Sequence, residues 1–442
     1  MNAASGLGKR TRARGGTSLL AHGESMLWLM GGALAVCLVM IVGLLALVAW
    51  QGATTFWPGP VVAVTMDDGR TFMGEVTRKE SFTPSPEIFA GLSDTEQGRL
   101  RGAIDEEGRS TRRLLRTGNF EVSGTHFEWV DDYSTERTTT PEWAVILERR
   151  EWGRFYGTPA EFRVDGAVVA QGPAASWQRF EDVHDDVSRR FARRYRLQKH
   201  DFGRLHAEAE RSRLAMREAE IKYGAASPEF ERTRGIHEGE LKALDTRGQA
   251  LEEEIRLLDD ENTRYQLLMA TAAGDTVPIP VVNVVRGYPA NRLHLGDKAE
   301  VYASRWKEFL TADPREANSE GGVWPAIVGT VIMTLLMSLA VVPFGVLAAL
   351  YLREYAKEGV MVSAVRIAIN NMAGVPSIVF GVFGLGFFCY ILGGSIDQLF
   401  FAGKLPNPTY GKGGVLWASL TLALLTLPVV VVATEEALAR VP

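Results

Sequence analysis

The stretch GGVWPAIVGTVIMTLLMSLAVVPFGVLAALYL, residues 321–352, contains no Asp, Glu, Lys or Arg and is rich in Leu, Val and Ala. Residues 26–50, 367–396 and 413–434 share this property. Each stretch is longer than the roughly 20 apolar residues that a helix needs to cross about 30 Å of hydrocarbon. A charge at mid-bilayer costs roughly 2.5–3.5 kcal/mol. The four uncharged stretches therefore predict a polytopic α-helical membrane protein.

The first apolar stretch follows a basic segment that includes Lys9 and Arg14. A cleaved signal peptide is one interpretation, but residues 26–50 are longer than the roughly 7–15 apolar residues of such peptides. We expect residues 1–25 to form a cytoplasmic basic tail and residues 26–50 to form a retained transmembrane helix. By the positive-inside rule, residues 51–320 then lie outside the cytoplasm.

Residues 51–320, the external block, contain two different sequence patterns. Residues 51–175 are expected to form a periplasmic β-rich domain, because Val61–Met66 and residues 71–77 alternate apolar and polar side chains around the turn sequence DDGR. The further strand candidates are residues 122–130, 144–148, 153–158 and 161–169, and residues 83–112 are interpreted as loop or short helix.

Residues 176–271 are expected to form a periplasmic antiparallel coiled-coil hairpin. Apolar residues recur at alternating steps of four and three over residues 191–223 and again over residues 230–269. Between the runs, Ser227 and Pro228 supply an N-cap and a proline at the first helical position. The hairpin is either a spacer or a docking surface for a soluble external partner.

Residues 272–320 are expected to return the chain to the membrane. Residues 277–285 form an apolar run with a proline, which is typical of an edge strand. Residues 302–310 have the pattern of a short amphipathic helix whose aromatic side chains suit a bilayer interface.

No catalytic constellation is found in the sequence. It lacks the Gly-x4-Gly-Lys-Ser/Thr nucleotide-binding loop, and the only two cysteines, Cys37 and Cys389, lie in apolar stretches. The histidines are too scattered for a metal site: His22, His126, His184, His200, His206, His237 and His294. The sequence therefore predicts neither an enzyme nor a metal or cofactor site, and any ATPase is a separate chain.

The third span begins NNMAGVPSIVFG, residues 370–381, an unusual start for a pure anchor. A proline removes a backbone donor, which is expected to free the carbonyl near Met372. Freed backbone at membrane depth is tolerated only when it is buried in protein or lines a cavity. Close helix packing through small residues is the simpler explanation, but the cluster as a whole favours a translocation path. The candidates are Asn370, Asn371, Gly374, Pro376 and Ser377.

The string AGVPSIVFGVFGLGFF, residues 373–388, resembles the signature of PstA-type permeases, the membrane subunits of bacterial phosphate importers. Residues 321–336, 345–356 and 422–442 resemble further parts of their core, and residues 292–318 resemble an extended form with a large periplasmic insertion. The resemblance implies a type I ABC importer permease with a MetI-like core over residues 321–442. Its helices are expected at about residues 322–352, 364–392 and 413–434.

The resemblance also implies a function and partners. The chain would be a permease subunit of an ATP-driven phosphate importer in the bacterial inner membrane, and would hydrolyse no ATP itself. Its partners would be a PstC-type permease, a cytoplasmic PstB-type ATPase dimer, a periplasmic PstS-type phosphate-binding protein, phosphate and membrane lipid, but no nucleic acid. Family members continue beyond the equivalent of Pro442, so the core is expected to be truncated at the start of the coupling loop. The approach to that loop comprises Glu435, Glu436, Ala437 and Leu438.

A membrane-anchored periplasmic coiled-coil sensor or scaffold is the alternative function, because the polar block is more than half of the chain. The Gly- and Pro-rich composition of the last three spans favours the permease.

Overall fold

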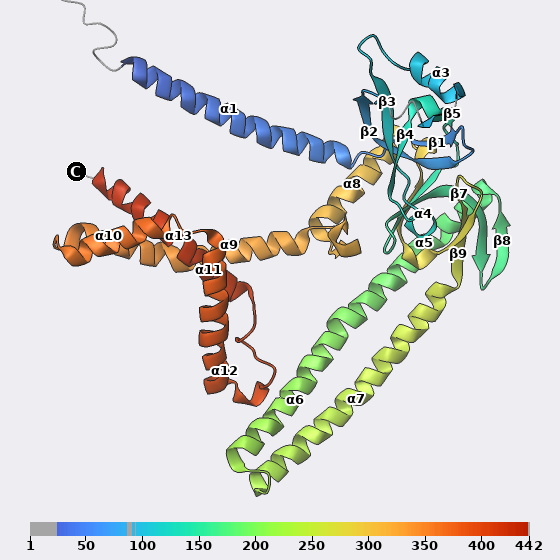
Figure 1. Ribbon diagram of the computed structural model, residues 1–442. Helices are drawn as coiled ribbons and strands as arrows, with labels where there is room; N and C mark the ends of the chain where they lie inside the picture. The colour runs from blue at the N-terminus through green and yellow to red at the C-terminus, as the bar shows by residue number, and fades with distance from the viewer. Residues whose placement is uncertain (1–23, 86–90, 93, 441–442) are drawn as a thin grey trace, which may run out of the picture. The chain divides into compact units, whose positions relative to one another are not determined.

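A computed structural model describes residues 24–85, 91–92 and 94–440 (Figure 1). The internal contacts divide the chain into two units. The first consists of Met1–Pro58 and Leu295–Trp306, and the second of Gly59–His294 and Lys307–Pro442.

The first unit is built on α1 (Glu24–Thr55), an apolar helix of 32 residues. Its described side chains are exposed along nearly its whole length. Apolar side chains exposed in this way suit contact with lipid. The end of this unit's first segment contacts α8 (Leu295–Thr311), which lies far away in the sequence. There Arg305 Nη1 donates to the carbonyl oxygen of Phe56 at 2.9 Å, and the rings of Phe56 and Trp306 lie 4.8 Å apart.

The second unit contains two antiparallel sheets that pair residues far apart in the sequence. The first sheet has the order β4-β3-β2-β1-β5. Its strands are β1 (Val61–Met66), β2 (Thr71–Phe82), β3 (Ser110–Arg116), β4 (Phe127–Asp131) and β5 (Thr135–Thr139). The pairing of β1 with β2 confirms the predicted hairpin around residues 67–70. Val64, Leu115 and Val130 fill the core of this sheet.

The second sheet has the order β10-β9-β7-β6-β11, with β8 paired to β7. Its strands are β6 (Val145–Arg149), β7 (Arg154–Val164), β8 (Ala167–Gln171), β9 (Tyr265–Ala270), β10 (Thr276–Pro280) and β11 (Val284–Pro289). Helix α5 (Pro173–Arg196) buries Trp177 and Phe180 against this sheet, in a core shared with Phe155 and Leu267.

Two long helical arms are inserted between β8 and β9 (Figure 1). The first arm continues from α5 through residues 197–201 into α6 (Phe202–Tyr223), and the second is α7 (Pro228–Thr263). Ser227 accepts a hydrogen bond from the Phe230 amide at 3.1 Å, which confirms the predicted N-cap. Along α6 the buried residues Leu205, Ser212 and Ala219 are seven apart, the spacing of a helical seam.

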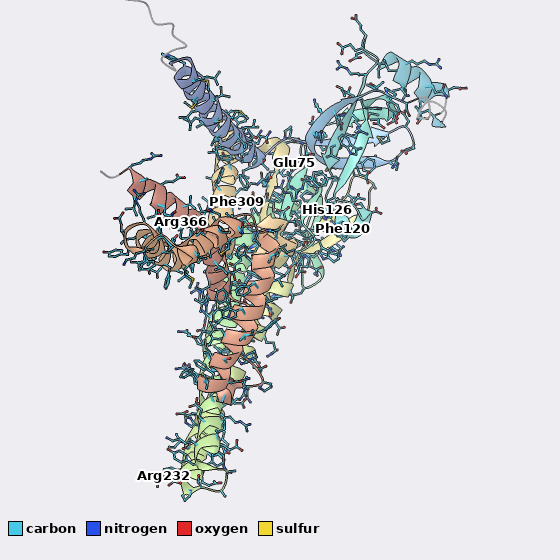
Figure 2. The ribbon with its side chains drawn as sticks, turned by 60° about the vertical axis from the view of Figure 1, so that its left-hand side comes forward. Glu75, Phe120, His126, Arg232, Phe309 and Arg366 are labelled. Atoms are coloured by element: carbon cyan, nitrogen blue, oxygen red, sulfur yellow. The ribbon has the colours of Figure 1, made fainter. Side chains whose placement is uncertain are left out.

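Polar contacts tie the two arms together. Ser212 Oγ donates to Glu240 at 2.8 Å, and Arg194 pairs with Asp259 at 3.1 Å. Figure 2 shows side chains projecting along both arms, with Arg232 near their tip. At 1.5 Å per residue, α7 alone is roughly 54 Å long.

The predicted end of the hairpin at residue 271 is wrong. The second arm ends at Thr263, and Tyr265–Ala270 forms β9, which pairs with both β7 and β10. Leu267 and Met269 are completely buried in the sheet, so strand pairing outweighs the helical period here. The β-rich domain is therefore completed by β9, β10 and β11, beyond the predicted boundary at residue 175.

Smaller elements also differ from expectation. Residues 122–130 are not one strand, because a helical turn, α4 (Phe120–Ser123), precedes β4. Residues 277–285 contribute to two strands with a 3₁₀ turn between them. Helix α3 (Asp94–Gly102) occupies part of the segment that was interpreted as loop or helix.

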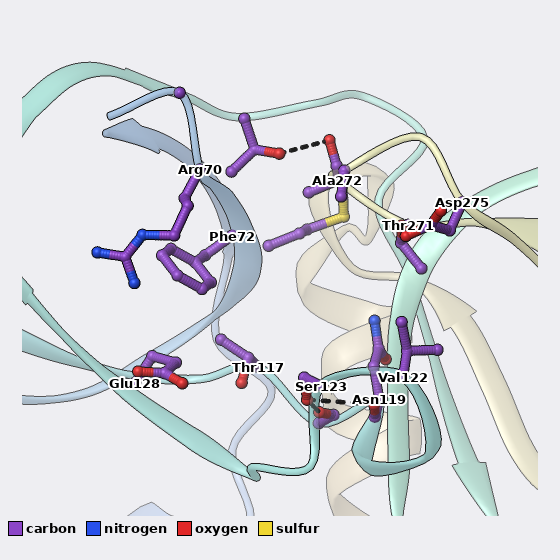
Figure 3. A pocket seen from close by; sticks show the side chains of 15 residues that line it. Arg70, Phe72, Thr117, Asn119, Val122, Ser123, Glu128, Thr271, Ala272 and Asp275 are labelled. Carbon is purple, nitrogen blue, oxygen red and sulfur yellow. Dashed lines mark hydrogen bonds between the residues drawn. The ribbon is translucent and has the colours of Figure 1, made fainter. Parts of the chain in front are cut away.

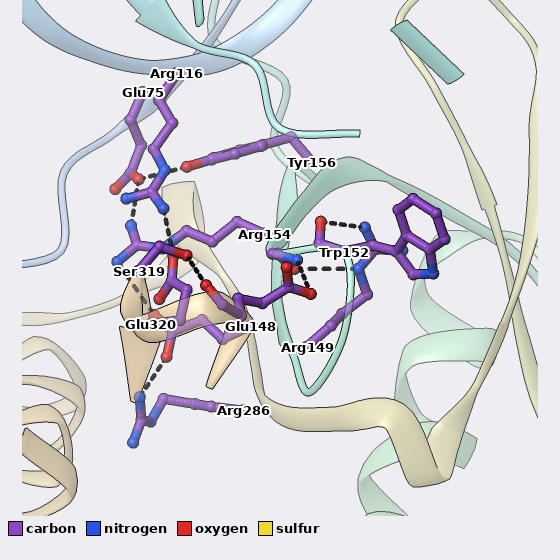
Figure 4. A network of polar contacts seen from close by, with 12 residues as sticks. Glu75, Arg116, Glu148, Arg149, Trp152, Arg154, Tyr156, Arg286, Ser319 and Glu320 are labelled. Carbon is purple, nitrogen blue, oxygen red and sulfur yellow. Dashed lines mark hydrogen bonds and ion pairs between the residues drawn. The ribbon is translucent and has the colours of Figure 1, made fainter. Parts of the chain in front are cut away.

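Alternating buried charges connect the two sheets to the chain that enters the membrane (Figure 4). Glu75 of β2 pairs with Arg154 of β7 at 2.9 Å, and Arg154 lies 3.7 Å from Glu148 of β6. Glu148 also pairs with Arg286 of β11, which pairs in turn with Glu308 of α8 at 3.0 Å. These five buried or partly buried side chains thus alternate in charge along the network. Each has an oppositely charged neighbour, which offsets the cost of removing it from water.

The last link of this charge chain lies immediately before the second span. Glu308 also pairs with Arg315, in the short strand β12 (Pro314–Arg315) that pairs with β13 (Glu320–Gly321). Gly321 has φ of +87°, which favours glycine, and a Cβ at Gly322 would overlap the carbonyl oxygens of Glu308 and Ala312. The entry into the span is therefore held in a fixed backbone path.

Four helices are long and apolar enough to cross a membrane among the residues described: Trp28–Thr55, Trp324–Tyr355, Ser377–Phe400 and Val415–Ala439. The second contains α9 (Trp324–Leu350) and the fourth is α13. The third is a continuous run of α11 (Ser377–Phe383), residues 384–393 and α12 (Gly394–Phe400). The protein is a polytopic membrane protein.

The predicted single helix over residues 364–392 is wrong. Helix α10 (Val360–Met372) is separated from α11 by four residues, 373–376, so the helix is interrupted there. We call this interruption the break. Pro376, with φ of −56° and ψ of 137°, is in an extended conformation. Such a ψ cannot continue a helix. The carbonyl of Met372 is not freed, because it accepts a hydrogen bond from the Val375 amide at 3.2 Å.

Replacing Glu148 with Ala should destabilise the second unit by about 3–5 kcal/mol, because Arg286 and Arg154 would lose a buried counter-charge. Urea unfolding of the detergent-solubilised chain, followed by circular dichroism, measures this change. The matched control is Glu253→Ala, which removes an exposed pair with Arg256 and should leave the stability almost unchanged, because water screens exposed ion pairs. Equal effects of the two substitutions would contradict a structural role for the buried charges.

Burial lowers the pKa of His184 below its ordinary value of 6.5, against the opposing effect of the Val284 carbonyl 3.1 Å from its Nε2. The unfolded chain therefore takes up a proton at a higher pH than the folded chain does. The contribution of neutral His184 to the free energy of unfolding should be fully present above about pH 7. It should fall as the pH drops below about 6.5. In unfolding measured across this range, His184→Gln should weaken the pH dependence, whereas the exposed His200→Gln should leave it unchanged.

Candidate translocation path

The contact between α9 and α13 is the scaffold of the membrane core. Gly345 of α9 faces Val430 of α13 so closely that a Cβ on the glycine would lie 2.6 Å from Val430 Cγ1. Ala349 and Val431 are buried in the same contact. Further along, Arg353 Nη1 donates to the carbonyl oxygen of Glu435 at 3.0 Å. Residue numbers therefore rise together along both helices, which means that α9 and α13 run in the same direction.

The third span packs against α13 in the opposite direction. Gly384 is buried against Thr421, and a Cβ on the glycine would overlap Thr421 Oγ1. One turn further, Phe388 stacks on Trp417 with ring centroids 6.4 Å apart. In lipid no hydrophobic force drives helices together. Small residues such as glycine allow the close approach from which van der Waals packing holds them.

A buried carboxylate fixes the loop between the third and fourth spans. Asp397 is only 1% exposed and accepts hydrogen bonds from the amides of Tyr410 (2.9 Å) and Gly411 (2.7 Å). Trp417 Nε1 donates to the Tyr410 carbonyl at 2.7 Å. Asp397 was not among the site residues predicted from the sequence. Its signal was available, because it is the one charged residue within Ser377–Phe400 and such residues are rare in spans unless they have partners.

The five predicted path residues lie around the break between α10 and α11. Asn370 and Asn371 are in the last turn of α10, Gly374 is in the connecting turn, and Pro376 and Ser377 begin the next helix. The Asn371 carbonyl accepts from the Gly374 amide at 3.0 Å. All five residues are exposed on this chain. The break thus presents amide and hydroxyl groups at the start of a 24-residue span.

The predicted coupling residues lie near the end of α13, where three segments meet. Glu435 is partly buried near the end of α13, and its carboxylate is 3.8 Å from Arg366 of α10. Arg366 Nη2 also donates to the carbonyl of Leu352, after α9, at 3.3 Å. Cationic side chains that donate hydrogen bonds to the carbonyl oxygens at a helix C-terminus are stabilising. The two arginines therefore connect the end of α13 to α9 and α10, whereas Glu436 and Ala437 are exposed.

In the part of the chain that the structure describes, no group of three or more His, Cys, Asp or Glu is arranged to hold a metal ion. The polar groups of the core are backbone groups, amides, hydroxyls, the carboxylates of Asp397 and Glu435, and the arginines Arg353 and Arg366. The hydrogen-bond donors among them can bind and guide an anion.

Comparison with known proteins identifies phosphate permeases as relatives. The chain is 34% identical over 124 residues to a probable phosphate transport system permease protein PstA of Methanocaldococcus jannaschii, covering 28% of this chain and 37% of that protein. It is 37% identical over 122 residues to PstA of Mycobacterium leprae, covering 28% and 34% of the two chains. A PstC permease of Mesorhizobium japonicum is 27% identical over 164 residues, covering 33% and 50%.

These findings confirm the resemblance to phosphate transport permeases. The chain spans between about a third and a half of the length of these curated relatives. No protein-family model matches the chain, and no solved structure matches it. The relatives reported above are transport permeases.

Replacing Gly384 with Val should separate the third span from α13 and lower the apparent melting temperature in detergent by several degrees, since overpacking costs typically 1–3 kcal/mol. The matched control is Gly381→Val in the same helix, because a Cβ at Gly381 meets no atom within 4 Å. If both variants melt at the same temperature, the packing of Gly384 on Thr421 is not the contact that holds this helix.

Proposed function

We propose that the chain is a transmembrane permease subunit of an ATP-driven phosphate importer and forms part of the phosphate path. The similarity to phosphate transport permeases carries this proposal. The interruption between α10 and α11 at residues 373–376, directly before the third span, supports it, because irregular backbone beside the hydrocarbon is tolerated where it lines a cavity or is buried by a partner.

The break is the proposed contact with phosphate. The first amides of a helix are not bonded within it, and together with the helix dipole they favour an anion. Ser377 begins the 24-residue span and adds a hydroxyl, while Asn370 and Asn371 bring amide groups to the same break. A path built from neutral donors can release phosphate again, whereas a dense cationic site would retain it.

The proposed topology places the N-terminus in the cytoplasm and residues 51–320 in the periplasm, in a bacterial inner membrane. The parallel direction of α9 and α13 fits a single span between them, and the basic residues Arg353 and Arg366 beside their joined ends favour the cytoplasmic side for those ends. The junction of Arg353, Arg366 and Glu435 then lies on the cytoplasmic side, where a PstB-type ATPase dimer would act.

The remaining proposed partners follow from the same assignment. A PstC-type permease would cover the exposed face of the break, and a PstS-type protein would deliver phosphate from the periplasm. In the proposed cycle, ATP binding moves the end of α13, and Arg366 and Arg353 carry that motion to α10 and α9. The domain inserted between the first and second spans is assigned to the periplasmic side, and the two helical arms α5–α6 and α7 are proposed as its coiled-coil hairpin.

Replacing Asn370, Asn371 and Ser377 together with Ala should reduce uptake of ³²P-labelled phosphate at least about tenfold, because the break would lose its polar side chains. Uptake is measured in a strain that lacks the native subunit and expresses the variant. Ser363→Ala, an exposed serine on the same helix α10, is the matched control and should retain uptake. Wild-type uptake by the triple variant, at equal abundance in the membrane, would exclude this segment from the path.

A further inference from the structure

A cavity of about 320 Å³ lies within the sheet domain, where three turns meet (Figure 3). One wall comes from the turn between β1 and β2, a second from residues 117–123, and a third from the turn between β9 and β10. The proposed phosphate path does not use this cavity, which belongs to a different part of the fold.

The cavity walls are held by bonds between distant segments. Thr71 Oγ1 donates to the Ala272 carbonyl at 2.8 Å and so links the first wall to the third. Asn119 has φ of +53° and binds both the amide (2.8 Å) and the carbonyl (2.9 Å) of Tyr156 through its side chain. The helical turn α4 that follows carries Val122, another lining residue. The shape of the cavity is therefore pre-organised, which lowers the entropic cost of binding.

The lining combines an apolar bed with negative charge. Phe72, Met73 and Val122 provide the apolar surface. The carboxylates of Glu128 and Asp275 lie on opposite sides of the cavity in Figure 3, and neither belongs to an ion pair among the described residues. The one lining cation, Arg70, is already paired with Asp68 at 2.6 Å. The unbalanced charge of the cavity is therefore negative, which disfavours an anion such as phosphate.

A buried hydroxyl in the lining lacks a partner. Thr117 is only 6% exposed, and its Oγ1 has no hydrogen-bond partner among the described residues. The Oγ1 of Thr271, on the opposite wall, is also unpaired. An unsatisfied buried hydroxyl is unfavourable, and rotation about χ1 can turn it towards a donor in the cavity.

We propose that this cavity binds an aliphatic ammonium group, that is, a cation at the end of a methylene stem. The stem would lie on Phe72, Met73 and Val122, as long charged side chains lie on apolar surface. The ammonium has three donors, and they suit the carboxylate of Glu128 or Asp275 together with a threonine hydroxyl. A free diamine and a lysine side chain of another polypeptide share this chemistry.

The test is isothermal titration of the full chain in nanodiscs of uncharged lipid, at low salt. The probes are cadaverine, which represents a free diamine, and the capped peptide acetyl-Gly-Lys-Gly-amide, which represents a lysine of a partner. Their neutral counterparts are 1,5-pentanediol and acetyl-Gly-Gln-Gly-amide. We expect saturable binding of at least one cationic probe, and binding of neither neutral counterpart.

Glu128→Gln combined with Asp275→Asn should weaken that binding at least about tenfold. Glu106→Gln, an exposed carboxylate outside the cavity, should leave it unchanged. Val122→Trp, which fills the cavity without changing its charge, should also abolish binding, and an unchanged melting temperature would show that the variants fold.

Binding of cadaverine alone would assign the cavity to a free amine, and binding of the lysine peptide would assign it to a partner. The proposal is overturned if neither cationic probe binds, if the neutral probes bind equally well, or if binding survives both the charge-removing and the cavity-filling substitutions. None of these outcomes depends on phosphate transport.

Discussion

The bilayer tolerates interrupted backbone hydrogen bonding only where protein or water receives the exposed groups. The described candidate spans obey that constraint with continuous helices, and the interruption between α10 and α11 at residues 373–376 lies directly before the third span, Ser377–Phe400. The surrounding contacts make the break possible. After the break, Gly384 packs on Thr421 of α13. Before it, Ile369 of α10 packs against the cluster of Ala349, Leu352 and Val431, so the interrupted segment is attached to a packed core on both sides.

Contacts within the same membrane core connect the two ends of the proposed path. The third span runs from the break at Ser377 to the buried Asp397, which fixes the following loop through the amides of Tyr410 and Gly411. At the opposite end, Arg366 connects α10 to both Leu352 and Glu435. A displacement of the end of α13 would therefore reach α10, and α10 ends at the break. This continuity gives the proposed coupling a physical route through contacts rather than through distance alone.

The polar domain depends on a different interaction, the compensation of buried charges. Glu148 between Arg154 and Arg286 joins strands from both sides of the helical insertion. Glu308 then extends the chain of charges to the entry of the second span. The insertion of two helical arms does not divide the sheet, because β9 returns to pair with β7.

The sequence predicted those elements whose signal is local. Absence of charge revealed the spans, and the Ser227-Pro228 pair identified the start of α7. It did not predict β9, because the apolar run Tyr265–Ala270 continues the helical period and only its pairing with distant strands makes it a strand. The break near Pro376 was visible as a cluster of residues, but its position between two separate helices was not. The buried charge network could not be predicted, since its members lie up to 233 positions apart.

The central claim is that residues around the break line a path that phosphate enters. Its most direct test is the reaction of Ser377→Cys with a membrane-impermeant thiol reagent, in a chain whose Cys37 and Cys389 are replaced by Ala. Val39→Cys in the middle of α1, 71% exposed on this chain and expected to face lipid, is the control. We expect the cysteine at 377 to react from an aqueous side, at a rate that changes with phosphate and ATP, while the cysteine at 39 stays unreactive. A cysteine at 377 that stays as unreactive as the one at 39, from both sides and in all conditions, would contradict the account.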